Sequence, residues 1–156
     1  MERGAPLQDR VAVDQFTGEA CRVDSRGRIA DALRAVADDG KALLSSPFIA
    51  ERYWKDPKWE QVRPNRRRAA EFRNELLEER PSAALQRLLM SVYFLRCQIV
   101  HGGATLGSGM NRVTVEPASR VLDALATQLA AVVVECGIEM RMGMLNYPPV
   151  RQPHAT

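Results

Sequence analysis

Apolar residues recur at helical spacing along most of this chain, and no useful stretch alternates apolar with polar residues as a strand would. The longest periodic segment is Ser82–His101, whose apolar positions are Leu85, Leu88, Leu89, Val92, Leu95, Ile99 and Val100. They cover a wide arc of a helix, so we expect this segment to be the central helix of the fold. The pattern predicts an all-α protein, an up-and-down bundle of four to five helices.

Proline, glycine and small polar residues mark the helix boundaries before the central helix. A first helix is expected at Arg28–Asp38, and Asp39-Gly40 should end or bend it. Ser46-Pro47 has the pattern of an N-cap followed by Pro at the first helical position, which predicts a short helix through Tyr53. A further helix is expected at Asn65–Glu79.

The segment after the central helix is rich in glycine. It should form a flexible loop up to about Glu116, in which Val113–Val115 could be extended. Pro117 then suits the first turn of the last helix, and Gly137 suits its C-terminal cap.

With 156 residues, the chain has the length of one domain with a single sizeable core. Residues 1–26 are polar and aperiodic, which predicts an N-terminal arm with little fixed structure. The helical domain is expected at residues 27–137. Residues 138–156, with three prolines, should form a C-terminal tail.

The cysteine and histidine content argues against disulfide and metal chemistry. Cys21, Cys97 and Cys136 are an odd number of widely spaced thiols, so we expect reduced cysteines in a cytoplasmic protein. No cluster of His and Cys could complete a metal site, so neither a metal nor a cofactor is expected. The longest uncharged run, Ala124–Val134, is too short to cross a bilayer, and no membrane association is expected.

The chain is mildly basic, with a net charge of +3, and 19 of its 22 basic residues are arginine. Arginine suits bidentate contact with phosphate, although genomic base composition explains such a bias equally well. Five of these residues cluster around the start of the third expected helix: Arg63, Arg66, Arg67, Arg68 and Arg73. A solvated helix face with Glu71 paired to Arg67 and Arg68 is the simpler interpretation, and a path for an RNA backbone is the alternative.

The residues most suited to catalysis lie at the end of the central helix, where Arg96 precedes His101 by five positions. The only other histidine, His154, lies in the Pro-rich tail. Five residues turn a helix by about 140° and advance it by about 7.5 Å, so the long Arg96 side chain could meet His101 at one phosphate. A histidine in a last helical turn is also a common structural choice, and spacing alone is a weak signal.

Neighbouring residues could assist such a site. Cys97 and Gln98 lie beside His101 on the helix, and Gly102 leaves room for an incoming backbone. Asn111 and Arg112, beyond the glycine loop, could reach the same phosphate.

The whole segment Leu88–Gly103 resembles the HEPN family, named for higher eukaryotes and prokaryotes nucleotide-binding, and more narrowly its Apea-like and related bacterial branches. The matching elements are Tyr93-Phe94-Leu95-Arg96, the apolar pair Ile99-Val100, and His101-Gly102. The stretch Ala118–Leu129 resembles the final helix of the family. The resemblance covers roughly residues 65–136.

The resemblance implies a helical bundle and a metal-independent endoribonuclease that works as a homodimer, in which two R-x4-H motifs share one cleft. Arg96 and His101 would be the catalytic pair, acting on RNA by attack of the 2′-hydroxyl. Such proteins are often toxins or defence effectors, and a nucleotidyltransferase-like antitoxin is a possible partner.

One departure from the family pattern supports a different function. The residue after the arginine is usually polar in active members, whereas here it is Cys97, a weak hydrogen-bonding group. The alternative is therefore a non-catalytic helical module that binds a nucleotide, a nucleic acid or a partner protein.

Overall fold

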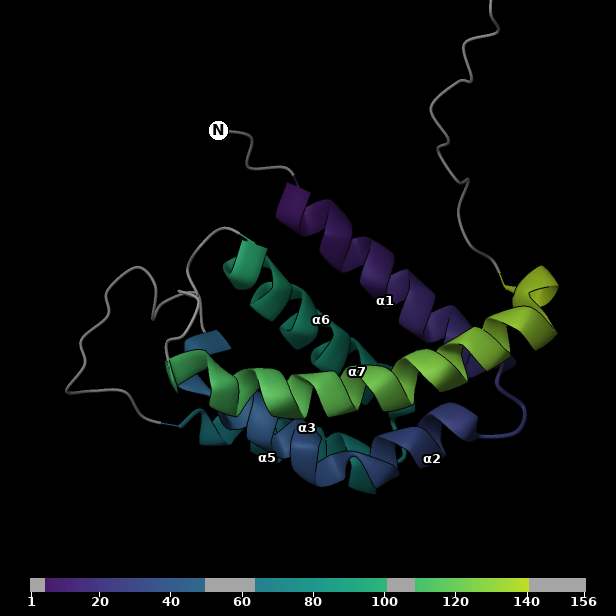
Figure 1. Cartoon of the computed structure of the whole chain (residues 1–156). Helices are drawn as coiled ribbons and strands as arrows, with labels where there is room; N and C mark the ends of the chain where they lie inside the picture. The colour runs from purple at the N-terminus through teal and green to yellow at the C-terminus, as the bar shows by residue number, and fades with distance from the viewer. Residues whose placement is uncertain (1–4, 50–63, 101–108, 141–156) are drawn as a thin grey trace, which may run out of the picture.

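The protein is an all-α bundle in the computed structural model, which describes residues 5–49, 64–100 and 109–140 (Figure 1). No residue of these ranges lies in a strand, so the predicted fold class is confirmed. The same ranges contain six α-helices rather than four or five, together with two short 3₁₀ helices. In chain order they are α1 Ala5–Val23, α2 Arg28–Ala35, α3 Ala37–Ser45, η1 Pro47–Ile49, α5 Arg66–Leu77, α6 Pro81–Val100, α7 Gly109–Cys136 and η3 Gly137–Glu139.

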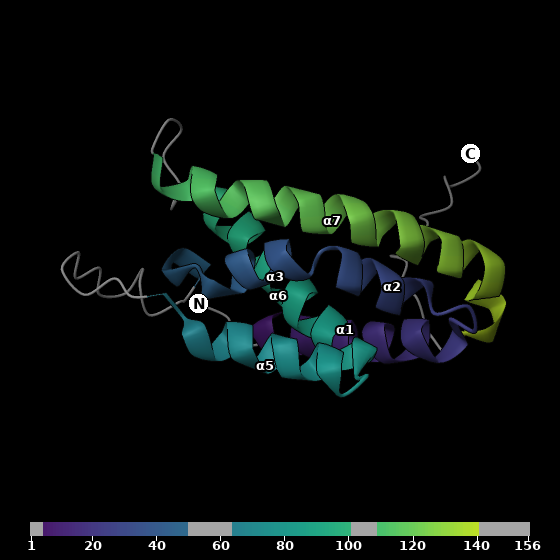
Figure 2. The ribbon, with the colours of Figure 1, turned by 90° about the horizontal axis from the view of Figure 1, so that it is seen from below.

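Helix α6 is the central helix, as its wide apolar arc predicts. It packs against each of the other five described α-helices. Figure 2 shows α7 along one side of the bundle and α1 with α5 along the opposite side, while α2, α3 and α6 lie between them. Leu85 and Leu88 of α6 are fully buried, together with Leu33, Leu43 and Phe72 from the surrounding helices.

The N-terminal segment is a helix and not an arm, so that prediction is wrong for residues 5–23. Helix α1 runs antiparallel to α6 and packs along it (Figure 1). Phe16, Ala20 and Val23, spaced by four and three residues, face the core. The stripe is narrow and includes Thr17, which is also fully buried and donates a hydrogen bond to the carbonyl of Asp14. A stripe made partly of small and polar residues gives little signal in the sequence.

The break between the first two core helices lies at Val36 and not at Asp39-Gly40. Helix α2 ends at Ala35, and α3 begins at Ala37 with Asp38 and Asp39 in its first turn. Acidic side chains there are stabilised by the positive end of the helix dipole. Gly40 lies inside α3 and is buried.

The boundaries of α5 and α6 agree closely with the predicted ones. Asn65 caps α5 by accepting a hydrogen bond from the backbone N–H of Arg68. Helix α6 begins at Pro81 itself, a position where the missing N–H of proline costs nothing. Of the short helix expected after Ser46, Pro47–Ile49 is a 3₁₀ turn, and its continuation through Tyr53 lies outside the described residues.

Helix α7 begins at Gly109, eight residues before Pro117, so the predicted loop to Glu116 is wrong for residues 109–116. The helix passes through Pro117 without the hydrogen bond that a proline nitrogen cannot donate. Thr114 is buried, and its Oγ1 lies 2.7 Å from the Oγ of Ser46. This tertiary contact holds the part of α7 that precedes Pro117. The helix ends at Cys136, directly before Gly137, as predicted.

Much of the apolar surface of α7 is uncovered in the described part of the molecule. Val134 is 84% exposed, and Leu122 is also exposed, as is Ile138 in the following η3. The segment Val113–Glu139 is long and apolar enough to span a membrane by length and composition, with 17% of its most apolar window buried. A soluble core helix can pass the same test, so this observation is weak evidence.

Candidate functional site

Arg96 lies near the C-terminal end of α6 and is exposed to solvent. Among the residues that the structure describes, it forms no ion pair, so its guanidinium is available for an anionic ligand. Its predicted partner His101 and the neighbouring Gly102 lie outside the described residues. The structure therefore places half of the predicted catalytic pair.

Two hydrogen bonds join the end of α6 and the start of α7 to the same short segment. Gln98 Nε2 donates to the carbonyl oxygen of Phe48 at 2.8 Å, and the Ser46 hydroxyl pairs with the Thr114 hydroxyl. Both helix ends therefore lie at one end of the bundle, as Figure 1 shows. Gln98 and Thr114, which are 16 positions apart in the sequence, are thus held at the same end of the bundle.

Gln98 contributes to the fold as well as to the candidate site. Its amide N–H is occupied by Phe48, while its Oε1 is buried and has no hydrogen-bond partner in the described part of the chain. A buried acceptor without a donor is costly. Gln98 therefore ties the end of α6 to the Phe48 segment, and its Oε1 is not open to solvent.

The other predicted contact residues lie on two helices, Cys97 on α6 and Asn111 with Arg112 on α7. Cys97 is half-buried and is a free thiol. Asn111 and Arg112 lie in the first turn of α7, and their side chains are outside the described part. They were expected on a loop, and their role in the site stays a prediction.

The cysteines show no disulfide. Cys21, Cys97 and Cys136 are free. Burial, with a smaller effect of the Asp24 carboxylate, raises the pKa of Cys21 to about 11. That thiol stays protonated at neutral pH and is a poor nucleophile.

Exposed apolar side chains are frequent at the end of α6 and the start of α7. Ile99 and Val100 lie at the end of α6 and are exposed, as is Phe94, whose ring meets Tyr93 edge to face at 6.0 Å. Val113 and Val115 at the start of α7 are exposed too. An exposed apolar surface of this kind is typical of an interface with another protein.

Only some of the α5 arginines lie on a solvent-exposed face of the helix. Arg67 pairs with Glu71 at 2.8 Å, as predicted, and Arg66 and Arg73 are exposed. Arg68 instead turns inward and donates to Ser91 Oγ at 3.1 Å. The predicted Arg68–Glu71 ion pair is therefore absent from the described interactions. Arg63 lies outside the described residues.

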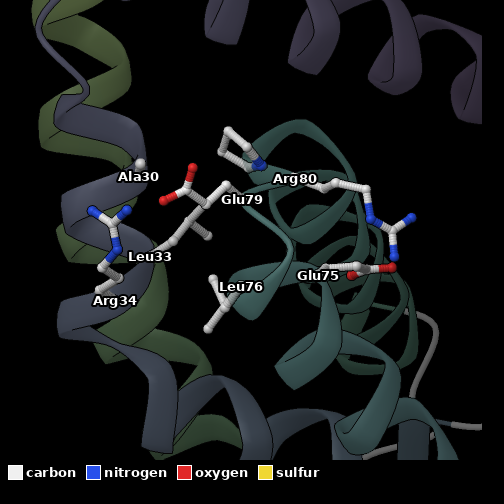
Figure 3. Close-up of a pocket in the computed structure, with 8 residues that line it drawn as sticks. Ala30, Leu33, Arg34, Glu75, Leu76, Glu79 and Arg80 are labelled. Carbon is white, nitrogen blue, oxygen red and sulfur yellow. The ribbon is translucent and has the colours of Figure 1, made fainter.

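A cleft of about 200 Å³ lies at the other end of α6, between α2 and the α5–α6 turn (Figure 3). Leu33 and Leu76 form its apolar part, and Arg34 and Glu79 lie at its edge. Arg96 is fifteen residues from Pro81 at this cleft, which is about 22 Å along a helix. The cleft is therefore separate from the Arg96 region.

No group of three or more His, Cys, Asp or Glu side chains within residues 5–49, 64–100 and 109–140 is arranged to hold a metal ion. No protein-family model, characterised protein or solved structure matches the chain.

Proposed function

We propose that the protein is a metal-independent endoribonuclease of the HEPN type, with Arg96 and His101 as its catalytic pair. The observation that carries the proposal is Arg96 at the end of the central helix, five residues before His101, exposed and without an ion pair among the described residues. Arg87 and Arg120, in contrast, pair with carboxylates.

The proposed reaction needs two functions from this helix end. The Arg96 guanidinium holds the phosphate and stabilises the negative charge that develops on its oxygens. The His101 imidazole moves a proton when the RNA 2′-hydroxyl attacks the adjacent phosphorus. The 5′-oxygen of the next nucleotide leaves with a proton, and the product is a 2′,3′-cyclic phosphate.

We propose that two copies of the chain form the cleft. The exposed apolar residues beside Arg96, above all Ile99 and Val100, suit burial against a second copy. A two-fold pairing through this surface brings two R-x4-H motifs together. A cytoplasmic toxin or defence effector, held inactive by a nucleotidyltransferase-like antitoxin, is the role that fits such an enzyme.

A second candidate function is a non-catalytic binding module. Gln98 supports it, because its amide bonds the Phe48 carbonyl and its Oε1 is buried, so this side chain contributes to the fold. The half-buried thiol of Cys97 adds little hydrogen bonding beside Arg96.

Incubation of the purified protein with mixed RNA in the presence of EDTA separates the two. We expect cleavage to 2′,3′-cyclic phosphate ends, no cleavage of DNA, and no cleavage by His101→Ala. Cleavage that EDTA abolishes would indicate metal-dependent chemistry and contradict the proposal. A folded wild-type protein that binds RNA without cutting it would favour the binding module.

A further inference from the structure

Helices α5 and α6 are joined by charged side chains of which only some are neutralised. Arg87 of α6 donates to both Glu75 oxygens, and its Nη1 donates to Glu71 at 2.8 Å. Glu75 is 5% exposed, and the other oxygen of Glu71 accepts from Arg67. The carboxylates of Glu71 and Glu75 therefore accept hydrogen bonds on both oxygens, all of them from Arg67 and Arg87.

Arg68 lies at the same interface without a carboxylate of its own. Its Nη2 bonds the neutral hydroxyl of Ser91, a fully buried residue whose own proton goes to the Arg87 carbonyl. Burial lowers the pKa of Arg68, and the charges of Arg87 and Arg10 lower it further against the attraction of Glu71. A half-buried guanidinium that faces two like charges and one shared carboxylate is poorly compensated.

Arg10 brings a second uncompensated charge to this place from α1. It is exposed and forms no ion pair within the described residues. Asp14, one turn along α1, accepts a hydrogen bond from Gln86 at 2.8 Å. Because α1 runs antiparallel to α6 (Figure 1) and Asp14 bonds Gln86, Arg10, one turn before Asp14, lies at about the level of residue 90 of α6. Arg68 bonds Ser91, so the two arginines reach a similar level of α6.

We propose that Arg10 and Arg68 bind a phosphate group, with Ser91 fixing the Arg68 guanidinium. A phosphate accepts several N–H bonds and supplies the negative charge that this interface lacks. Ser91 is fully buried at the α5–α6 interface, whereas Arg96, five residues later, is exposed to solvent. The proposed phosphate site is defined by binding and does not depend on ribonuclease activity.

Two sources could supply the phosphate, a nucleic-acid strand or a free phosphate ester, and two probes distinguish them. One is inorganic phosphate, titrated by calorimetry. The other is a short 2′-O-methyl RNA strand, which lacks the free 2′-hydroxyl and so cannot be cleaved by internal attack. We expect Arg10→Gln and Arg68→Gln each to weaken binding of the responding probe about tenfold, as expected for loss of a charge-assisted bond.

Arg73→Gln is the matched control, because it removes an exposed arginine from the same helix as Arg68. It should bind as the wild-type protein does. With the RNA probe, each site variant should also reduce the slope of log K against log salt by about 0.7. Arg68→Gln could weaken the packing of α5 on α6. Arg10 is exposed, so Arg10→Gln removes a charge from the site without that effect on packing. Circular dichroism checks that both variants are folded.

Each outcome decides the proposal. Binding of phosphate that both variants weaken identifies a site for a free phosphate ester, and the same result with RNA alone identifies a strand. Equal binding by wild type, Arg10→Gln and Arg68→Gln would overturn the site, as would a wild-type protein that binds neither probe.

Discussion

Gly40 of α3 and Phe72 of α5 meet so closely that a Cβ atom on Gly40 would lie 2.8 Å from the Cε1 atom of the phenyl ring. The same Cβ would lie 3.3 Å from a methyl group of Leu88. Phe72 and Leu88 are fully buried, so neither side chain has space to move away. The glycine is therefore required for the approach of the two helices and not for a bend.

Gly40→Ala should lower the free energy of unfolding. Overpacking a core costs about 1–3 kcal/mol, and the better helix propensity of alanine returns about 0.5–1 kcal/mol. We expect a net loss of about 1–2 kcal/mol, measured by urea denaturation at neutral pH. Gly18→Ala is the control, since Gly18 lies inside α1 and its added Cβ would meet nothing within 4 Å. That variant should be more stable than wild type, and equal effects of the two changes would refute the packing argument.

Glu79 holds the left-handed position at the end of α5, with φ of 53°. Its N–H bonds the Leu76 carbonyl, and the N–H of Arg80 bonds the Glu75 carbonyl at 2.8 Å, the pattern of a Schellman cap. Glycine is the usual residue there. Glu79→Gly should stabilise the fold by about 1 kcal/mol, seen as a rise in Tm of about 2–4 °C.

Glu78→Gly tests whether that gain comes from the backbone. Glu78 has φ of −88°, so glycine relieves no strain there; it adds flexibility and removes the exposed ion pair with Arg80. It should lower Tm. A rise in both variants would point to the loss of acidic side chains as the cause.

The free energy of unfolding should depend on pH through the carboxyl group of Glu71. The hydrogen bond from Arg67, with a further contribution from Arg87, holds the pKa of this carboxyl below its usual 4.5. A carboxyl with a lowered folded-state pKa stabilises the fold above the unfolded-state pKa, and this contribution disappears as the pH falls through the folded value. Glu71→Gln should therefore be less stable than wild type near neutral pH, and the two proteins should converge at strongly acidic pH. Denaturant titrations across that range measure the difference.

The sequence predicts the parts of the fold whose apolar periodicity is strong. Helices α5 and α6 lie within one or two residues of their predicted bounds because Asn65 and Pro81 set their starts by local chemistry. Helix α1 was missed because its buried face includes Thr17 and Ala20. The early start of α7 was missed because it depends on Thr114 meeting Ser46, a contact across 68 residues.

In the candidate site, too, some features could be predicted from the sequence and others depend on tertiary packing. Arg96 could be selected from the sequence because its neighbourhood resembles a known motif, and its exposure agrees with that role. The bond from Gln98 to Phe48 and the inward turn of Arg68 depend on how helices pack. Spacing along one helix cannot predict which side chains another helix will engage.

Variants of the catalytic pair give the most direct test of the proposed chemistry. His101→Ala should reduce RNA cleavage by about 10²–10⁴-fold, the usual contribution of general acid–base catalysis, while RNA binding is largely kept. Arg96→Lys keeps the positive charge without the planar fork, so it should restore cleavage only partly relative to Arg96→Ala. Because Arg96 is exposed, both Arg96 variants should unfold at the same denaturant concentration as wild type. A loss of several kcal/mol of stability in Arg96→Ala, with cleavage unchanged per folded molecule, would show that this arginine serves the fold and not the reaction.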